Sequence, residues 1–332
     1  MPLCITMYKL DHIDRKIIYE LGKNSRLSYK QIAKNINSKK EVVAYHIKQL
    51  IARRMITKFV PVFALSRLNI FSSKIYLRLQ GLNKEAEKKL YDYLRSDPEI
   101  VWIAKCVGRW DLLLGMYTKN IVDFSNKKSK ILSIFGKYIK DYDITQIEDG
   151  LVFNRDYLTK KPVTYRQHFV FGGKVENNVL DKEEIRIIQL IKNDARFQAT
   201  DISKKLNIDA RTVIKKIKNL QKREILQGFT VFLDIKKIGI QFHKLCIHLQ
   251  NYEKNNISKL TSFLKANPNT IHLIKSLGSW ELEVEIETEN SSNIHDYISE
   301  IRNKFPETIK QIDLVTITDE LKLDFFPENY HI

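Results

Sequence analysis

Apolar residues recur at helical spacing in two stretches of the chain, one near its start and one just after its middle. In the first helix expected in each stretch they lie three or four positions apart: Ile13, Ile17, Ile18 and Leu21, then Ile185, Ile188 and Ile191. A shorter helix and then a third helix follow in both stretches, the third with these inward residues: Val43, Ile47 and Leu50, then Val213, Ile217 and Leu220. The pattern therefore predicts two bundles of three short helices.

Polar residues mark the expected starts of these helices. Ser28 in the first stretch, and Thr200 or a neighbour in the second, are suited to cap the second helix. Asp209 is a good N-cap for the third helix of the second stretch, whereas the first stretch has Ser38-Lys39 at that point. We therefore expect the third helix of the first stretch to begin less cleanly.

After each helical stretch the pattern changes to one that combines strands and helices. Residues 59–63 and 229–233 are expected strands, and residues 74–80 alternate polar and apolar side chains as a half-buried strand does. The elements expected next are a helix, two strands, a helix and a strand, at 84–96, 100–107, 112–117, 121–138 and 142–153. The second copy repeats this order at 244–250, 257–266, 271–277, 282–287, 292–304 and 309–323. The order β-α-β-β-α-β is that of a ferredoxin-like domain.

The two parts of the chain are copies of one another. An offset of 170 positions aligns fourteen identical residues within the fifty positions from Leu10 to Phe59, without a gap. The predicted fold class is therefore α+β, with two winged-helix (helix-turn-helix) domains that alternate with two ferredoxin-like domains. We expect these domains at 1–63, 64–153, 180–233 and 234–332. Residues 154–179 are expected to be a linker that can include one strand. Its residues Phe169 to Phe171 are expected to be able to pack against another part of the protein.

Positive charge is concentrated in the two helical stretches. The chain has 56 Lys and Arg against 39 Asp and Glu, a net charge of +17. Residues 1–63 carry 13 basic and 4 acidic side chains and residues 180–233 carry 12 and 7, whereas residues 234–332 carry 11 and 15. Two separate basic domains favour double-stranded DNA as a partner that is bound at two places.

The third helix of each bundle has the composition of a DNA-recognition helix. Two helices joined by a three-residue turn, the second with a basic outer face, can place that helix in the major groove. The residues expected to contact DNA in the first copy are Lys39, Lys40, Tyr45, His46, Gln49, Arg53 and Arg54. In the second copy they are Arg211, Thr212, Lys215, Lys216 and Asn219. The alternative is that both faces are ordinary solvated helix surfaces.

These features resemble the Lrp/AsnC (feast/famine) family of transcriptional regulators, in both halves and over nearly the whole length. The residues that carry the resemblance are Leu180-Asp181, Ile202, Leu206-Asn207-Ile208-Asp209, Thr212-Val213, Ile217, Leu220 and the turns Gly108-Arg109-Trp110-Asp111 and Gly278-Ser279-Trp280-Glu281. The resemblance implies a fused pseudo-dimer whose α/β domains are of the RAM/AsnC type, self-associate and sense an amino acid. It also implies that both turns border an effector site, with these candidates: Gly108, Arg109, Trp110, Asp111, Gly278, Ser279, Trp280 and Glu281. The alternative is an ordinary tight hairpin in each copy.

The two copies differ on one face of the sheet. The second copy has three glutamates where the first has other residues: Glu283, Glu285 and Glu287 against Leu113, Gly115 and Tyr117. In the ferredoxin-like strand order the third strand lies beside the first, so Lys244 and His248 are expected to neutralise part of this acidic face. We predict that the effector site of the second copy is lost or altered.

Few residues support another class of function. The three cysteines, Cys4, Cys106 and Cys246, lack the spacing of a disulfide framework or a zinc site, and no apolar run reaches transmembrane length. We therefore expect a cytoplasmic protein without metal or cofactor. The enzyme alternative is an Lrp-related siroheme decarboxylase, but the segment 103–108, comparable with the His/Cys/Arg-rich stretch of that class, has no histidine. We expect a regulator and not an enzyme; the third possibility is an architectural DNA-binding protein.

Overall fold

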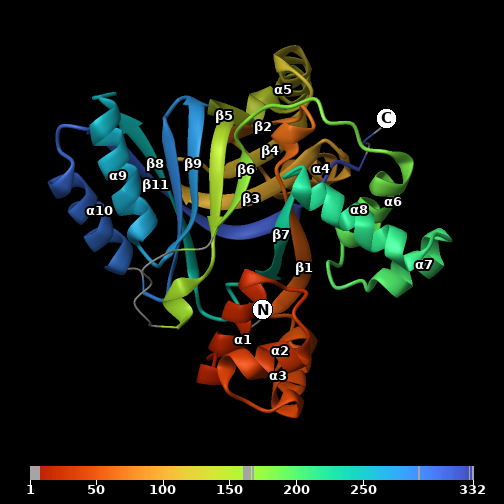
Figure 1. Ribbon diagram of the computed structural model, residues 1–332. Helices are drawn as coiled ribbons and strands as arrows, with labels where there is room; N and C mark the ends of the chain where they lie inside the picture. Colours follow the sequence, from red (N-terminus) through yellow and green to blue (C-terminus); the bar gives the residue numbers. More distant parts are fainter. Residues whose placement is uncertain (1–7, 160–165, 167, 291, 329, 331–332) are drawn as a thin grey trace.

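The same order of elements occurs twice in the chain (Figure 1). The computed structural model describes residues 8–159, 166, 168–290, 292–328 and 330, so Cys4 lies outside the described residues. The first helical domain consists of α1 (His12–Lys23), α2 (Tyr29–Ile36) and α3 (Lys40–Ala52), and strand β1 (Ile56–Phe63) follows it. The second consists of α6 (Lys182–Ile191), α7 (Ala199–Leu206) and α8 (Ala210–Lys222), and strand β7 (Leu226–Leu233) follows it. Both predicted three-helix bundles are confirmed.

The helix starts agree with the predicted caps, with one exception. Asp209 accepts a hydrogen bond from the first turn of α8 (2.7 Å), whereas Lys39 provides no side-chain cap to α3. Ser28 caps α2 as predicted. The prediction that Thr200 or a neighbour caps α7 is wrong, because the helix begins earlier and the backbone carbonyl of Gln198 accepts its first hydrogen bonds.

Each helical domain completes its core with a strand from the other half. β1 and β7 pair antiparallel, with Phe59 opposite Val231. The side chains of Val231 and Leu233 lie in the hydrophobic core of the first helical domain, and that of Phe63 lies in the core of the second. A half on its own would expose these apolar surfaces to water, so neither helical domain is complete without the other half.

A reciprocal pair of arginines joins the two helical domains. Arg26 donates to the backbone carbonyl of Phe197 (3.0 Å), and Arg196 donates to the backbone carbonyl of Ser25 (2.9 Å). Each guanidinium also lies over a phenylalanine ring of the exchanged strands, at 4.9 and 5.2 Å from the ring centre. Because the two arginines are equivalent positions of the repeat, the two halves are related by an approximate two-fold axis here.

The two α/β domains have the predicted β-α-β-β-α-β order. The first consists of β2 (Phe71–Leu79), α4 (Lys84–Ser96), β3 (Ile100–Gly108), β4 (Leu112–Thr118), α5 (Ile121–Phe135) and β5 (Ile139–Phe153). The second consists of β8 (Gln241–Leu249), α9 (Lys254–Ala266), β9 (Thr270–Gly278), β10 (Leu282–Thr288), α10 (Ser292–Lys304) and β11 (Ile309–Leu323). Single 3₁₀ turns occur at η1 (Leu65–Arg67), η2 (Gly136–Tyr138) and η3 (Asp156–Leu158). Among the described residues, no helix has both the length and the apolar character needed to span a bilayer.

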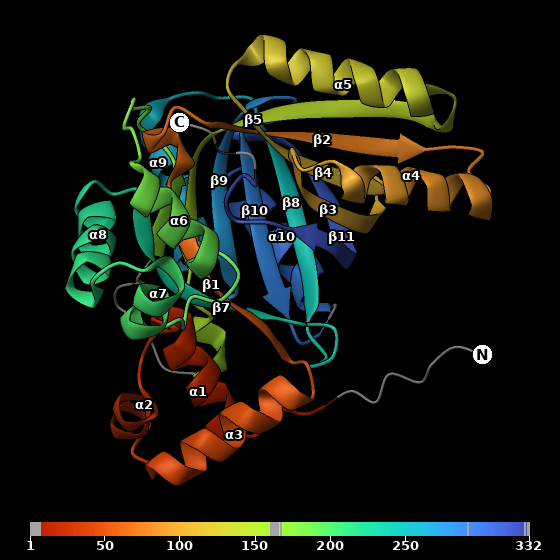
Figure 2. The same cartoon turned by 90° about the vertical axis from the view of Figure 1, so that its right-hand side faces the viewer.

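The strands of both α/β domains close into one eight-stranded barrel (Figure 2). Within each half the strand order is the ferredoxin-like one, β5-β2-β4-β3 and β11-β8-β10-β9. β3 pairs with β11 and β5 pairs with β9, so the edge strands of each half are paired with the other half. Helices α4 and α5 pack outside the first set of strands, and α9 and α10 pack outside the second. The two α/β domains therefore associate with each other inside one chain.

A buried ion cluster lies inside the barrel. Glu283, which is 0% exposed, accepts hydrogen bonds from Lys74 and Lys244, both at 2.6 Å. The two lysines are equivalent positions of the repeat and approach Glu283 from opposite halves. Burial acts to raise the pKa of Glu283, but the two ammonium groups outweigh it and lower the pKa to about 2. A charge buried so deeply is tolerated because it is paired on both sides.

The predicted neutralisation of the acidic face is half correct. Lys244 pairs with Glu285 (2.7 Å) as well as with Glu283, as predicted. His248 does not take part and instead lies 3.0 Å from Asp313. The strand register explains the difference. Lys244 is opposite Glu285 and Cys246 is opposite Glu283, so His248, two residues further along β8, lies past all three glutamates.

The linker contributes one strand, β6 (His168–Gly172), which pairs with β5. The rings of Phe169 and Phe171 pack directly on Gly228 and Gly150, where an added Cβ atom would collide with them. The two glycines thus permit the close approach of the rings. The docking expected for these phenylalanines is confirmed.

Both described cysteines are buried and free. Burial raises the pKa of the Cys106 thiol to about 12. Because the thiolate is the reactive and metal-binding form, these side chains act as small apolar groups in the barrel.

Glu320 lies near the ion cluster without a paired cation. Trp102 Nε1 donates to its carboxylate (2.9 Å). Burial raises the pKa of Glu320 to about 7, with a further contribution from Glu285 and Glu287, against the lowering effect of Trp102 and His272. The folded protein therefore holds this proton more tightly than an unfolded chain, in which the ordinary value is 4.5.

Replacing Leu233 is expected to destabilise the helical domain of the other half. Leu233 is 3% exposed in the core of α1, α2 and α3. The substitution Leu233→Ala should lower the free energy of unfolding of that domain by about 2–5 kcal/mol. Hydrogen exchange of native protein should then be faster in α1–α3. The matched control is Leu260→Ala, which leaves a cavity of similar size in α9; equal acceleration of α1–α3 in both variants would contradict the exchanged core.

Replacing Glu320 is expected to remove a pH dependence of stability. Because the folded pKa is raised, the wild-type protein should lose stability as the pH rises from about 4.5 through about 7. Glu320→Gln should lack this loss and be more stable than the wild type above pH 7, by up to about 3 kcal/mol. Urea unfolding of both proteins between pH 5 and pH 8 measures the difference, and parallel curves would refute the assignment.

Candidate nucleic-acid interface

The recognition helices α3 and α8 are positioned by buried apolar residues and by the turn before them. The inward residues are each at most 8% exposed: Val43, Ile47 and Leu50, then Val213, Ile217 and Leu220. Asn37 and Asn207 end the preceding helices in the left-handed conformation, with φ of 54° and 55°. Asparagine adopts this conformation more readily than most side chains, so the same turn forms in both halves.

The outward faces of α3 and α8 carry most of the residues predicted to contact DNA. In the first half Lys39, Lys40, Tyr45, Arg53 and Arg54 are exposed and Gln49 is half-buried. In the second half Arg211, Lys215 and Asn219 are exposed and Thr212 is half-buried. The two helical domains that carry these faces meet at the β1–β7 pair (Figure 1). The structure therefore offers two separate polar and basic helix faces.

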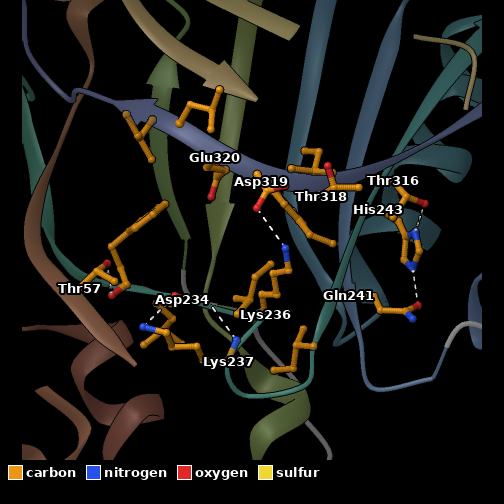
Figure 3. Close-up of a pocket in the computed structure, with 18 of the residues that line it drawn as sticks. Thr57, Asp234, Lys236, Lys237, Gln241, His243, Thr316, Thr318, Asp319 and Glu320 are labelled. Atoms are coloured by element: carbon orange, nitrogen blue, oxygen red, sulfur yellow. Dashed lines mark hydrogen bonds and ion pairs between the residues drawn. The ribbon is translucent and has the colours of Figure 1, made fainter. Parts of the chain in front are cut away.

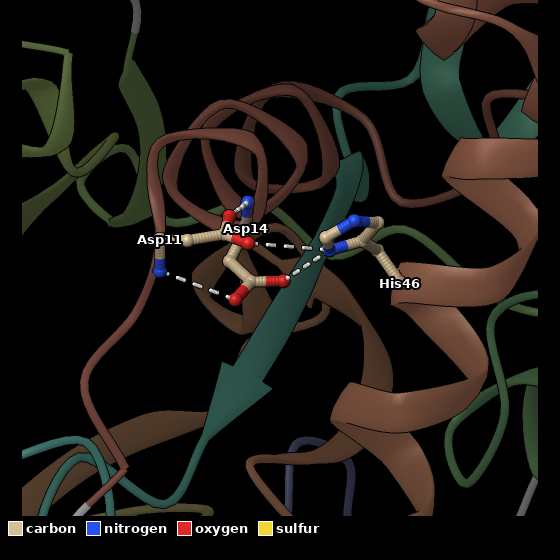
Figure 4. Close-up of side chains that lie close together, drawn as sticks. All are labelled: Asp11, Asp14 and His46. Carbon is tan, nitrogen blue, oxygen red and sulfur yellow. Dashed lines mark hydrogen bonds and ion pairs between the residues drawn. The ribbon is translucent and has the colours of Figure 1, made fainter.

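Three of the predicted residues point toward the first helix of their own domain: His46, Lys216 and Asn219, whose Nδ2 donates to Glu184 of α6 (3.3 Å). His46 Nδ1 lies 2.8 Å from Asp14 Oδ1 and 3.9 Å from Asp11 Oδ2 (Figure 4). Lys216, at the equivalent position of the second half, pairs with Asp181. The side-chain atoms of Asp11, Asp14 and His46 that could bind a metal lie within 4.8 Å of one another. In the second half, however, Lys216 takes the position of His46 and pairs with Asp181, which indicates a contact between helices in both halves. His46 and Lys216 thus hold α3 and α8 in position.

Sequence reasoning missed one pair of outward cations. Lys48 and Lys218 are exposed and are identical at equivalent positions of the repeat. They follow Tyr45 and Lys215 by three positions, which places them on the same helix face. The three-residue spacing from Tyr45 and Lys215 is the sequence feature that could have identified both lysines as outward-facing.

The two predicted effector turns lie at the β3–β11 and β5–β9 strand pairs, where the two halves meet and which we call the seams. Gly108 has a φ of 126° and Gly278 a φ of 143°, a region that favours glycine. Each glycine lies directly against a backbone carbonyl of the other half, that of Leu314 or Ile144. The tryptophans of both turns are at most 1% exposed. Close packing at the seam therefore requires glycine at both positions.

Polar side chains of the turns connect the halves across the seams. Arg109 pairs with Asp313 (2.5 Å) and Asp143 (3.3 Å), and Ser279 donates to Asp143 (2.6 Å). The acidic residues that end the turns each accept a backbone N–H bond of 2.8 Å from a neighbouring strand. The predicted effector residues are thus engaged in contacts within the protein, and none of them lines the cavities described next.

One cavity, of about 240 Å³, lies where the barrel faces the β1–β7 pair. It is lined by residues of β1 and β7 and by these barrel residues, among others: Lys74, Trp102, His272 and Glu285. A larger groove of about 930 Å³ lies between β7, β8 and β11 (Figure 3). Polar side chains gather along this groove, including His243, which lies 2.9 Å from the Thr316 hydroxyl.

Comparison with known proteins matches the first helical domain to a family model. Residues 10–57 match the family described as winged helix-turn-helix DNA-binding, HTH_24. The position agrees with α1–α3 and the start of β1.

The sequence relatives are named as transcriptional regulators. The HTH-type transcriptional regulator FL11 of Pyrococcus horikoshii is 24% identical over 119 residues, which are 36% of this chain and 78% of FL11. An uncharacterised HTH-type transcriptional regulator of the same organism is 25% identical over 148 residues, 43% of this chain and 98% of that protein. LrpC of Bacillus subtilis is 22% identical over 120 residues, 36% of this chain and 82% of LrpC. The second of these relatives is thus matched almost whole by less than half of the chain.

One solved structure is similar to both halves together. The siroheme decarboxylase NirDL superposes with a TM-score of 0.62 at 12% identity, over 94% of this chain and 93% of NirDL. At this identity the likeness shows a shared fold. The resemblance found in the sequence is confirmed by these matches: residues 10–57 are similar to the winged helix-turn-helix DNA-binding family, and the sequence relatives are named as HTH-type transcriptional regulators, LrpC among them.

Proposed function

We propose that this chain is a sequence-specific DNA-binding transcriptional regulator that acts as a covalently fused pseudo-dimer. The observation that supports this best is the pair of recognition helices, each with an exposed polar and basic face, held in one unit by the exchanged strands. The sequence relatives are named as HTH-type transcriptional regulators, which supports the same class for this chain. Exposed lysines and arginines on both faces suit the phosphates of double-stranded DNA.

The two helical domains differ at the positions that would face DNA, so we infer that each contacts its own half-site. Arg211 at the start of α8 has Glu41 as its equivalent on α3. Arginine can donate two hydrogen bonds to guanine, whereas a glutamate accepts from cytosine. A lysine, Lys215, also stands where α3 has Tyr45. The two half-sites should therefore be unlike, and lie about one helical turn or a small multiple apart.

We further propose that an effector of the amino-acid class acts at the first turn, Gly108 to Asp111. Arg109 is 38% exposed and bridges the seam through Asp313, so a carboxylate that competes for this guanidinium would loosen the contact between the halves. In the second turn Ser279 replaces the arginine, and Glu281 is held by the Tyr252 hydroxyl. The second turn thus lacks the cation, which supports one effector site in each chain.

Single substitutions on the two recognition helices should have different effects along the DNA. Arg211→Ala is expected to weaken binding by about 1–3 kcal/mol and to relax base preference at one half-site. Lys40→Ala should reduce protection at the other half-site instead, because Lys40 is exposed at the start of α3. Footprinting on a selected DNA fragment, with affinity measured at several salt concentrations, separates these effects.

The control for both variants is Lys84→Ala, an exposed lysine at the start of α4, which should leave affinity and footprint unchanged. Equal weakening of both half-sites by Arg211→Ala would contradict two separate reading faces. A long, featureless footprint would indicate an architectural protein in place of a regulator.

The enzyme alternative is supported by the fold match to NirDL, which extends over both halves. A decarboxylase needs positioned acid-base groups. Several described histidines are instead engaged with carboxylates: His46 with Asp14, His248 with Asp313 and His272 with Glu285. A histidine oriented by a carboxylate can also act as an acid-base group, so these contacts do not separate the two classes, and it is the lack of histidine in the segment 103–108 that favours the regulator.

Titration with iron uroporphyrin III distinguishes the two classes. An analogue of this porphyrin is bound in one structure of NirDL. For a regulator, the absorption spectrum of the mixture should equal the sum of its components. A shifted Soret band that saturates at one equivalent would favour the enzyme.

A further inference from the structure

The cavity between the barrel and the β1–β7 pair has a volume of about 240 Å³ and is lined by equivalent residues of both halves. Pairs of lining residues at the 170-residue offset of the repeat include Phe63 with Leu233, Val101 with Ile271 and Trp102 with His272. The cavity therefore lies where the two halves face each other, and neither half could form it alone.

The two halves contribute different side chains to this cavity. The described carboxylates that line it all come from the second half: Glu285, Glu287, Glu320 and Asp324. The equivalent residues of the first half carry no acidic group: Gly115, Tyr117, Gly150 and Asn154. The cavity thus has one acidic side, whereas a symmetric dimer would have two.

The basic side chains of the cavity wall already have partners. Each contacts a carboxylate: Lys74 with Glu283 at 2.6 Å, Arg155 with Glu287 at 2.9 Å, and His272 with Glu285 at 2.5 Å. An anionic ligand would have to compete with these glutamates for every basic group that the described wall offers. The wall is therefore not suited to a carboxylate or a phosphate.

Glu320 is the lining glutamate that has no basic partner in the described part of the chain. Trp102 Nε1 donates to its Oε1 (2.9 Å), and no described residue donates to its Oε2. Glu320 lines both the cavity and the neighbouring groove, but Trp102 lines only the cavity, so this bond holds the carboxylate at the cavity. Burial, together with Glu285 and Glu287, raises the pKa of Glu320 to about 7, so a cation beside it would be stabilised.

Aromatic side chains form much of the remaining wall. They include Phe63, Phe171, Phe232 and Phe325. Because an apolar cavity of about 150 Å³ admits benzene, a cavity of about 240 Å³ has room for a phenyl ring with a two-carbon chain and an ammonium group. Apolar walls with one polar group of fixed position are typical of a small-molecule site.

We propose that this cavity binds a small organic cation, namely a primary amine on an aromatic or other apolar body that carries no carboxylate. The ammonium of the ligand meets Glu320, and its apolar body lies against the phenylalanine rings. The groove in Figure 3 lies directly outside, because Phe232 and Phe325 line both spaces. The site is separate from both effector turns and does not depend on the proposed DNA-binding role.

Calorimetric titration of the full chain at pH 8, where Glu320 is ionised, tests the proposal. The probe is phenethylamine, whose amine is protonated at this pH, and the control is 2-phenylethanol, which has a hydroxyl in place of the ammonium. Phenethylamine should bind at one site per chain, and 2-phenylethanol should bind at least about ten-fold more weakly because it cannot form the ion pair.

An excess of phenylalanine should not displace phenethylamine, because its carboxylate would face the acidic side of the cavity. Absence of phenethylamine binding, equal affinity for the alcohol, or displacement by phenylalanine would overturn the proposal.

A matched pair of variants locates the site. Glu320→Gln should weaken the binding of phenethylamine by about ten-fold or more, because the charge that pairs with the ammonium is lost. Glu307→Gln, the same change at an exposed residue before β11, should leave the affinity unchanged. Thermal unfolding checks that both variants fold. Binding that survives Glu320→Gln would place the amine elsewhere and refute the assignment.

Discussion

The exchange of strands β1 and β7 is the contact on which the rest of the structure depends. Each helical domain buries its apolar face on the strand of the other half, with Val231 and Leu233 in the first core and Phe63 in the second. Burial of apolar surface is the main favourable term in folding, so the halves are joined by the same force that folds each of them. The reciprocal contacts of Arg26 and Arg196 then fix how the two recognition helices are placed.

The closed barrel extends this dependence to the α/β domains, and it is also where the halves diverge. Lys74 and Lys244 are equivalent residues, yet both bind Glu283, which has Leu113 as its equivalent. A symmetric dimer would contain two copies of each group, whereas one chain can keep a single glutamate between two lysines. The same freedom allows the described carboxylates of the cavity to come from the second half alone.

Local features of the sequence predicted much of the fold. The recurring order of helices and strands, the caps at Ser28 and Asp209 and the β-α-β-β-α-β order rest on spacing and on short-range hydrogen bonds, and the structure confirms them. Lys244 could be predicted to pair with the glutamates because neighbouring strands of one domain place them together. The contact of Lys74 with Glu283 could not be predicted, because it forms only when strands of the two halves close into one barrel.

The candidate site was predictable to a similar degree. Periodicity identified the outward faces of α3 and α8, but it could not show that His46 and Lys216 turn toward Asp14 and Asp181. A helical pattern gives the side of a helix on which a residue lies, and a long side chain at the border of that side can bend either way. The contacts of Arg109 and Ser279 across the seams likewise depend on residues far away in the sequence.

Selection of bound DNA from a random pool, with the full chain, tests most directly whether the two halves act as one regulator with two different heads. The proposed function predicts sites with two unlike half-sites at a fixed spacing, because the exposed Arg211 stands at the start of α8 where α3 has Glu41. Enrichment of a perfect palindrome would contradict this account, since it would require both recognition helices to contact the same bases.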